Sequence, residues 1–176
     1  QQATRSTCAP TLSMTYKSTP GGARNCIEFN RTVMGDLQET ESVDIVVLAA
    51  RWNHYLRPNV ELLVFDGDRT SEILADQAAE SLESSLSETI QTIRASGKRV
   101  VLIDAPPSAH YDVSRCMERA RRLLPTLGSF TDCSIPNDEY RQLRLGSNQV
   151  MDGIAQRLKV SIIHFDEYLC VVGECI

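Results

Sequence analysis

Three short, largely apolar runs predict the strands of one sheet. Residues 43–50 form the first run, which only Asp44 interrupts, and residues 100–104 and 160–165 form the second and third. Runs rich in β-branched residues and lacking alternation are typical of strands that are buried on both faces of a parallel sheet. Two prolines follow the second run at residues 106–107, and they cannot continue a hydrogen-bonded ladder.

Apolar residues at spacings of three and four predict helices over residues 26–41, 71–96, 112–124 and 137–158. The clearest is 71–96, which places Leu74, Ala78, Leu82, Leu86, Ile90 and Ile93 on one stripe. In residues 26–41 the inward positions are Ile27, Phe29, Val33, Met34 and Leu37, and in 137–158 they are Tyr140, Leu143, Val150, Ile154 and Leu158. A strand, a long helix and a second strand in succession predict two parallel neighbouring strands.

The order of elements predicts a three-layer α/β/α sandwich with a parallel sheet, formed by residues 1–176 as a single domain. Residues 1–25 are rich in Thr, Ser, Pro and Gly and are expected to form loops. Residues 56–70 combine turn signals with a small apolar run, and could be a hairpin arm or a loop over the core. Three strands are few for this fold, and the chain opens at Gln1 without an initiator Met, so we expect further sequence at one or both ends.

Charge and hydropathy exclude several classes of function. The formal net charge of −5 argues against a nucleic-acid partner, because phosphate binding needs a basic face. One basic run, residues 115–122, is best interpreted as a solvated helix face. No apolar run approaches the length of a membrane span, and no signal peptide is recognisable.

The six cysteines fall into three local pairs: Cys8 with Cys26, Cys116 with Cys133, and Cys170 with Cys175. Six cysteines allow fifteen connectivities. We predict the local pairs, because each lies in or beside a loop and none needs to cross the core. The competing interpretation is a zinc site, but there is no C-x-x-C motif and no His at ligand spacing from a Cys. Disulfides indicate an oxidising compartment.

Candidate chemistry lies where the first strand ends, at Arg51, Trp52 and Asn53. In open α/β sheets, ligands bind just beyond the carboxyl ends of such strands. A side-chain amide there, such as that of Asn53, can donate a hydrogen bond to a developing oxyanion. The alternative interpretation is that Trp52 and the nearby Tyr55 merely close the end of the core.

Other signals are weaker or absent. The chain contains no G-x-S-x-G elbow, no P-loop, no G-x-G-x-x-G and no H-E-x-x-H, so no bound nucleotide, cofactor or metal is expected. Asp104, His110 and Asp112 cluster after the second strand and could orient a base, although surface polar groups are the commoner interpretation. His164, near Asp166, is interpreted as a core histidine of the third strand.

Several stretches together resemble the extracytoplasmic SGNH (GDSL-like) domain that is fused to bacterial membrane acyltransferases of family three. The stretches are Cys8-Ala9-Pro10, VDIVVLAARW at 43–52, GKRVVLIDAPP at 97–107 followed by Cys116, and D-x-x-L-C-x4-C from Asp166 to Cys175. The resemblance covers nearly the whole chain. It implies an SGNH-hydrolase-like sandwich with flavodoxin-like topology, and O-acetylation of surface polysaccharides such as lipopolysaccharide O-antigen.

The family's catalytic motifs are absent from residues 1–176. The resemblance implies that the G-D-S nucleophile precedes Gln1 and that the D-x-x-H pair follows Ile176. In the wider superfamily the strand that matches residues 43–50 ends in G-x-N-D, whose Asn is an oxyanion donor. Arg51-Trp52-Asn53-His54 occupies that place and keeps the amide, while Arg51 and His54 replace Gly and Asp.

The resemblance therefore implies Asn53 as an oxyanion donor, with Trp52 and Arg51 at the substrate site. The implied partners are a polysaccharide acceptor and an acyl donor that the fused membrane domain delivers, and the implied location is periplasmic. By itself this segment is expected to carry no covalent catalysis. The alternative is a catalytically empty, disulfide-stapled extracellular module that binds glycan or a partner protein.

Overall fold

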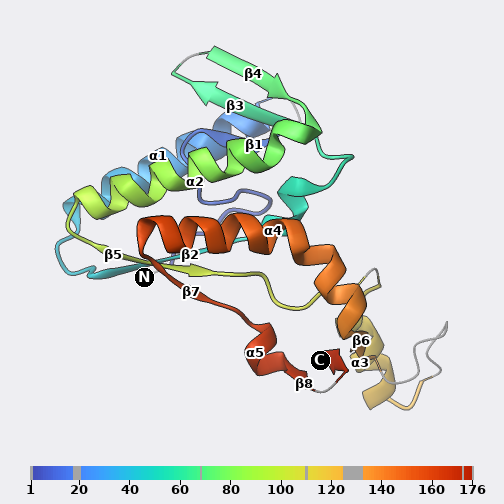
Figure 1. Ribbon diagram of the computed structural model, residues 1–176. Coiled ribbons are helices and arrows are strands. Elements are labelled where there is room, and N and C mark those ends of the chain that lie inside the picture. Colours follow the sequence, from blue (N-terminus) through green and yellow to red (C-terminus); the bar gives the residue numbers. More distant parts are fainter. Residues whose placement is uncertain are drawn as a thin grey trace. The chain divides into compact units, whose positions relative to one another are not determined.

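The computed structural model describes residues 2–17, 21–67, 69–109, 111–124, 133–171 and 173–175. The chain forms two compact units. Unit 1 comprises residues 1–104 and 146–163, and unit 2 comprises residues 105–145 and 164–176. Figure 1 shows the elements of both units.

The centre of unit 1 is a parallel sheet built from the three apolar runs. Its strands are β2 (Ile45–Ala49), β5 (Arg99–Ile103) and β7 (Ser161–Ile163), in the order β2-β5-β7. Val46 pairs with Val100, and Leu102 pairs with Ile162, with all strands parallel. The expected mixed α/β fold with a parallel sheet is therefore confirmed.

Helices of unit 1 cover one face of this sheet (Figure 1). They are α1 (Gly22–Glu39), α2 (Ala78–Ala95) and the end of α4 (Asn137–Leu158). The α2 residues Leu82, Leu86, Ile90 and Ile93 are at most 1% exposed, as their spacing predicts, and they share a core with Val46, Leu48 and Leu102. On β2 the alternate residues Ile45 and Val47 are 45% and 52% exposed. The opposite face of β2 therefore presents apolar side chains to solvent.

A second, antiparallel sheet of unit 1 lies on the far side of α1 and α2 (Figure 1). It is built from β1 (Met14–Tyr16), β3 (Leu62–Asp66) and β4 (Arg69–Ile73), in the order β1-β3-β4. Gly67, with φ 60°, lies in the turn between β3 and β4 and provides the left-handed backbone that this turn requires. Residues 56–70 thus contain a hairpin arm, one of the two possibilities that the sequence left open.

The hairpin corrects the predicted start of the long helix. The residues through Ile73 pair with β3, and the chain then passes through η2 (Ala75–Gln77), a 3-10 turn, into α2. Leu74, expected on the buried stripe, is 69% exposed. Strand pairing with Leu62 holds Ile73 in extended backbone, which outweighs the local helical periodicity.

A buried lysine connects α1 to the sheet. Lys98 is 7% exposed, and its Nζ donates hydrogen bonds to the carbonyl oxygens of Thr40 (2.7 Å) and Val43 (3.1 Å). It thereby satisfies carbonyls where α1 ends and just before β2 begins. Gly97, with φ 79°, follows α2 in the left-handed conformation that commonly ends a helix.

Unit 2 contains α3 (Val113–Arg121), the first part of α4, α5 (Asp166–Leu169) and a small antiparallel sheet. The sheet strands are β6 (Ile135–Pro136), β9 (Glu174–Cys175) and β8 (Cys170–Val171), in that order. Ile135, Tyr140 and Cys175 form its small apolar cluster.

One inward position predicted on α4 is wrong. Leu143 is 45% exposed, whereas the neighbouring Arg144 is 1% exposed. The Arg144 guanidinium donates hydrogen bonds to the Ala105 carbonyl oxygen and to Tyr140 Oη (2.8 Å). It also lies 5.1 Å from the centre of the Tyr140 ring. These polar contacts stabilise a buried cation, which hydrophobic periodicity alone does not anticipate.

All six cysteines are paired, as Cys8–Cys26, Cys116–Cys133 and Cys170–Cys175. The predicted set of local disulfides is therefore present. Among the residues that the structure describes, no helix is long and apolar enough to cross a membrane.

Candidate functional site

The chain turns sharply where β2 ends. After Ala49 the backbone leaves the sheet, and residues Trp52–Leu56 form a 3-10 turn, η1. The N–H of His54 donates to the carbonyl oxygen of Arg51 at 2.9 Å, which closes the start of the turn. Trp52, Asn53 and Tyr55 are buried, whereas Arg51 is exposed. The turn therefore gathers polar and aromatic side chains at the carboxyl edge of the parallel sheet.

Trp52 fixes the turn to the neighbouring strand. Its side chain has no exposed surface, and its indole Nε1 donates a 2.9 Å hydrogen bond to the carbonyl oxygen of Ile103, the last residue of β5. A buried indole N–H normally finds such an acceptor. In this conformation Trp52 supports the turn from within the core and presents no surface to a ligand.

Asn53 is the buried polar residue of the turn, at 7% exposed. Within the described part of the chain, its side-chain amide makes no hydrogen bond. Its amide atoms are not among the buried polar atoms that lack a partner, so they keep contact with solvent and are accessible to a ligand. A neutral amide N–H in this position can donate to an oxygen that develops negative charge.

Three aromatic rings lie together beside Asn53. The ring of Tyr16, from β1, stacks on Tyr55 with centroids 4.2 Å apart and planes 24° apart. The same ring meets His54 edge-on, with centroids 4.9 Å apart. Both geometries are favourable for aromatic pairs. Tyr16 was not singled out from the sequence, because its contacts join residues that are far apart in the chain.

Burial and neighbouring charges determine the protonation states of His54, Tyr55 and Tyr16. Burial, followed by the positive charges of Arg57 and Arg51, holds the pKa of His54 below its ordinary value of 6.5. Burial raises the pKa of Tyr55 to about 12, and burial together with Tyr55 also raises the pKa of Tyr16. The two phenols therefore stay protonated and the imidazole stays neutral at pH 7.

His54 also has an uncommitted atom. Its Nδ1 is buried and has no hydrogen-bond partner within the described residues. The imidazole is neutral, so its ring nitrogens together offer one donor and one acceptor. His54 therefore adds no positive charge to the turn at pH 7.

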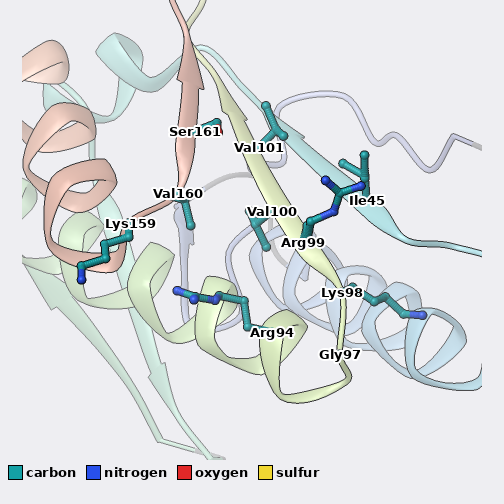
Figure 2. Close-up of a pocket in the computed structure, with 10 residues that line it drawn as sticks. All are labelled: Ile45, Arg94, Gly97, Lys98, Arg99, Val100, Val101, Lys159, Val160 and Ser161. Atoms are coloured by element: carbon teal, nitrogen blue, oxygen red, sulfur yellow. The ribbon is translucent and has the colours of Figure 1, made fainter.

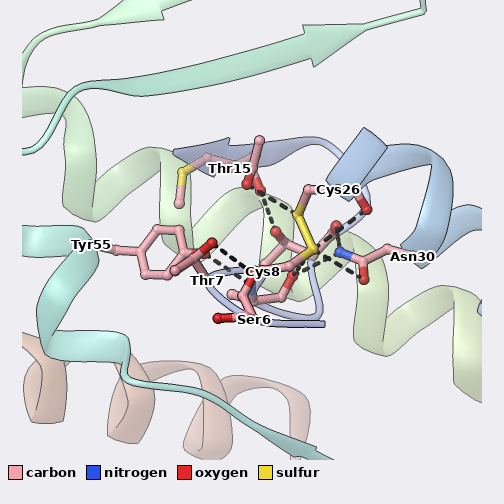
Figure 3. The surroundings of a disulfide bond; sticks show 10 residues. Ser6, Thr7, Cys8, Thr15, Cys26, Asn30 and Tyr55 are labelled. Carbon is pink, nitrogen blue, oxygen red and sulfur yellow. Dashed lines mark hydrogen bonds between the residues drawn. A yellow bond between two sulfur atoms is a disulfide. The ribbon is translucent and has the colours of Figure 1, made fainter. Parts of the chain in front are cut away.

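The Cys8–Cys26 disulfide supports the turn from outside the sheet (Figure 3). It holds the loop in which the N–H of Ala9 donates to Tyr55 Oη at 2.9 Å. The side-chain Nδ2 of Asn30, on α1, donates to the carbonyl oxygens of Ala9 (2.7 Å) and Thr11 (2.8 Å). A continuous set of bonds thus connects the disulfide loop, α1 and the η1 turn.

A hollow at the opposite end of the sheet, where the parallel strands begin, is less suited to chemistry (Figure 2). It lies at the amino ends of β5 and β7 and is bordered by the cations Arg94, Lys98, Arg99 and Lys159. Lys98 is held by backbone carbonyls, and Arg94 donates to the carbonyl oxygen of Leu158 at 2.6 Å. Arg94 and Arg99 point to different sides of β5 in Figure 2, so the charges do not converge on one ligand.

The other polar residues that the sequence pointed to lie at the ends of different helices and strands. Asp104 is 1% exposed and directly follows β5, and its N–H donates to the carbonyl oxygen of Ile163 at 3.0 Å. Asp112 caps α3 by accepting from the N–H of Arg115 at 2.9 Å, which is a structural role.

His110 lies outside the described residues. His164 directly follows β7 instead of lying within it, and Asp166 begins α5.

Among the described residues, no group of three His, Cys, Asp or Glu side chains is arranged to hold a metal ion. The six cysteines are unavailable as zinc ligands because their sulfurs are bonded to one another.

Comparison with known proteins gives two positive findings. The family model described as "SGNH domain (fused to AT3 domains)" matches residues 1–176. The fold is similar to the solved structure of the lipopolysaccharide acetyltransferase periplasmic domain of Salmonella serovar Paratyphi A, with a TM-score of 0.54 and 14% sequence identity. That match covers 95% of this chain and 55% of the other, so the chain spans about half the length of the structure it matches. No curated protein sequence matches the chain significantly.

Proposed function

Because this chain belongs to the family of SGNH domains that are fused to AT3 domains, we propose that it is the extracytoplasmic part of an O-acyltransferase. In this proposal it transfers acetyl groups to hydroxyls of cell-surface polysaccharide through a serine-linked acyl-enzyme. Two further observations support the proposal: the structural similarity to a lipopolysaccharide acetyltransferase domain, and three disulfides, which suit an oxidising compartment such as the periplasm.

The uncommitted amide of Asn53 carries the proposal. Attack of a serine on an acetyl ester converts the carbonyl oxygen into an oxyanion, and catalysis requires a donor fixed at that oxygen. Asn53 is 7% exposed on a turn that Trp52 anchors to β5, so the backbone that carries the amide is held in place before substrate binds. A preorganised donor stabilises the transition state more than a mobile one does.

The unpaired edge of β2 can accept a further strand that carries the nucleophile. Within the described residues β2 pairs only with β5, so its other edge is unpaired. We place the G-D-S segment that the family resemblance implies on a further strand parallel to β2 along this edge. The carboxyl ends of parallel neighbours coincide, so the serine would lie beside the η1 turn and Asn53.

The proposed reaction has two steps. The serine Oγ attacks the acyl carbonyl carbon of the donor, and the histidine of the implied D-x-x-H segment takes its proton. The oxyanion accepts a hydrogen bond from Asn53, and collapse expels the leaving group, which takes up the proton. A sugar hydroxyl then attacks the acyl-serine with proton transfer to the same histidine. Collapse releases the acetylated sugar and returns the proton to the serine.

The remaining residues have supporting roles in this proposal. Arg51 is exposed at the start of the turn and would contact the polysaccharide acceptor, while Trp52 positions Asn53 from within the core. The acyl donor would come from the membrane acyltransferase domain to which such SGNH domains are fused. No metal or cofactor takes part in these steps.

The test is the substitution Asn53→Ala in the intact protein. We expect the turnover of acetyl transfer to fall by about a hundredfold or more, the usual cost of one oxyanion donor, while the circular dichroism spectrum stays unchanged. The matched control is Asn25→Ala, which removes an exposed amide from α1 and should leave turnover unaltered.

Two other outcomes would contradict the proposal. Full activity in Asn53→Ala would exclude Asn53 as the oxyanion donor. No acetyl transfer by the wild-type protein to its own de-O-acetylated surface polysaccharide would favour the alternative of a non-catalytic glycan- or protein-binding module.

A further inference from the structure

A pocket of about 330 Å³ lies beside the Cys8–Cys26 disulfide, whose surroundings Figure 3 shows. Its volume is at the lower end of the range of about 300–1,000 Å³ that is typical of small-molecule sites. The lining residues that offer polar or aromatic side chains to a ligand are Arg5, Ser6, Thr7 and Tyr16. None of the lining residues that the structure describes is a carboxylate.

Tyr16 joins this pocket to the η1 turn. Tyr16 is one of the residues that line the pocket, and its ring contacts the rings of His54 and Tyr55, at 4.9 Å and 4.2 Å between centroids. His54 directly follows Asn53 in η1. A ligand that occupies the pocket and reaches past Tyr16 would therefore arrive at the residue next to the proposed oxyanion donor.

The pocket walls are held in place before any ligand binds. Thr15 Oγ1 donates to Cys26 Sγ at 3.1 Å, and the Arg5 guanidinium lies 5.9 Å from the centre of the Phe29 ring. Stacking on Tyr55 fixes the plane of the Tyr16 ring. Preorganised walls reduce the entropy cost of binding.

The chemistry of these walls suits a sugar ring. A pyranose has a face of C–H groups that packs on an aromatic ring, and an edge of hydroxyls that hydrogen-bond to side-chain hydroxyls and a guanidinium. The raised pKa of Tyr16 keeps its phenol protonated and able to donate. With Arg5 at the wall and no carboxylate among the described lining residues, the pocket favours neutral or acidic sugars over amino sugars that carry positive charge.

We propose that the pocket between Tyr16 and the Cys8–Cys26 disulfide binds one sugar residue of the acceptor polysaccharide and presents the adjoining residue to the η1 turn. This inference rests on the proposed function, because it assigns the acceptor-binding part of the same site. Tyr16 is then a residue that determines acceptor binding and takes no part in the acyl-transfer chemistry.

The test measures binding of an oligosaccharide from the host's own surface polysaccharide, de-O-acetylated with mild base, to the intact protein by isothermal titration calorimetry. Ser6→Trp fills the pocket from an exposed loop position, and Tyr16→Leu removes the stacking ring. We expect each change to raise Kd about tenfold or more, and Tyr16→Phe to raise it about threefold or less. The pocket-filling variant guards against the possibility that Tyr16→Leu only disturbs folding.

Two matched controls place a similar change away from the pocket. Thr4→Trp adds an indole to the same exposed segment without lining the pocket, and Tyr168→Leu removes a tyrosine that is 73% exposed in unit 2. Both should bind the oligosaccharide as the wild type does. Unchanged Kd in folded Ser6→Trp and Tyr16→Leu, or no binding by the wild type, would overturn the inference.

A second readout separates this inference from the proposed function. Hydrolysis of p-nitrophenyl acetate by the wild type needs the acyl-transfer groups but no acceptor sugar, so it reports the acyl-transfer chemistry independently of oligosaccharide binding. Hydrolysis without oligosaccharide binding would refute the sugar subsite alone. Binding that depends on Tyr16, with neither hydrolysis nor transfer, would refute the acyltransferase proposal and leave the subsite standing.

Discussion

The indole Nε1 of Trp52 and the carbonyl oxygen of Ile103 are joined by a 2.9 Å hydrogen bond. The two residues lie just beyond β2 and at the end of β5, which are parallel neighbours. This one bond fixes the turn that carries Asn53 to the edge of the sheet. The Trp52 side chain is fully buried, so water is excluded from this hydrogen bond.

Trp52→Phe removes that donor while keeping an aromatic side chain. We expect the free energy of unfolding to fall by roughly 1–3 kcal/mol, because the Ile103 carbonyl loses its partner and the smaller ring leaves a void. Urea denaturation followed by circular dichroism measures this, since the variant lacks the chain's only tryptophan. A change below about 0.5 kcal/mol, the usual size for surface substitutions, would show that the bond is unimportant.

Tyr55→Phe tests the link between the η1 turn and the disulfide loop. The buried N–H of Ala9 loses its acceptor, so stability should fall by roughly 1–3 kcal/mol. Urea denaturation followed by Trp52 fluorescence measures the change. The exposed Tyr168 provides the control, since Tyr168→Phe should leave the midpoint where it is.

Replacing Cys8 and Cys26 together by serine removes the crosslink behind this loop. The two cysteines are 18 residues apart, for which the chain-entropy model gives a loss of about 3 kcal/mol. The same change at Cys170 and Cys175, which are 5 residues apart, should cost about 2 kcal/mol. Thermal unfolding of both double variants compares them, and equal midpoints would contradict the link between loop length and stability.

The pKa of His54 makes stability depend on pH. It is lower in the folded protein than the ordinary 6.5, so between these two values the unfolded chain binds more protons. Stability should therefore fall as the pH drops from about 6.5 toward the folded pKa of His54, and should be independent of this group above 6.5. His54→Gln should reduce this dependence, as measured by urea unfolding at a series of pH values.

An NMR titration of the His54 ring provides a direct check. Arg57→Gln removes one of the two charges that lower this pKa, so the midpoint should move upward, toward 6.5. A midpoint above 6.5 in the wild type would contradict the assignment of a neutral imidazole.

The sequence predicted the parallel sheet well because each strand is a short, locally apolar run. It also located Trp52 and Asn53, because residues that follow a buried strand must lie at the edge of the sheet. It did not predict β1 or β4. Met14–Tyr16 is three residues long, and Arg69–Ile73 is almost entirely exposed, so neither carries a strong pattern.

The rest of the site depends on contacts between distant parts of the chain. The Tyr16 ring meets His54 and Tyr55 only because β1 and the η1 turn come together in unit 1. In the same way Arg144 replaces Leu143 in the interior because Ala105 and Tyr140 provide its acceptors. Periodicity reports which side of an element is apolar, but it does not report such polar partners.

The most direct test of the central proposal is to label the intact protein with a fluorophosphonate probe and to map the modified peptide by mass spectrometry. The account predicts a labelled serine in a G-D-S segment outside residues 1–176, with slower labelling in Asn53→Ala, because the probe's oxygen needs the same donor. A labelled serine within residues 1–176, or a labelling rate that does not change in Asn53→Ala, would contradict it.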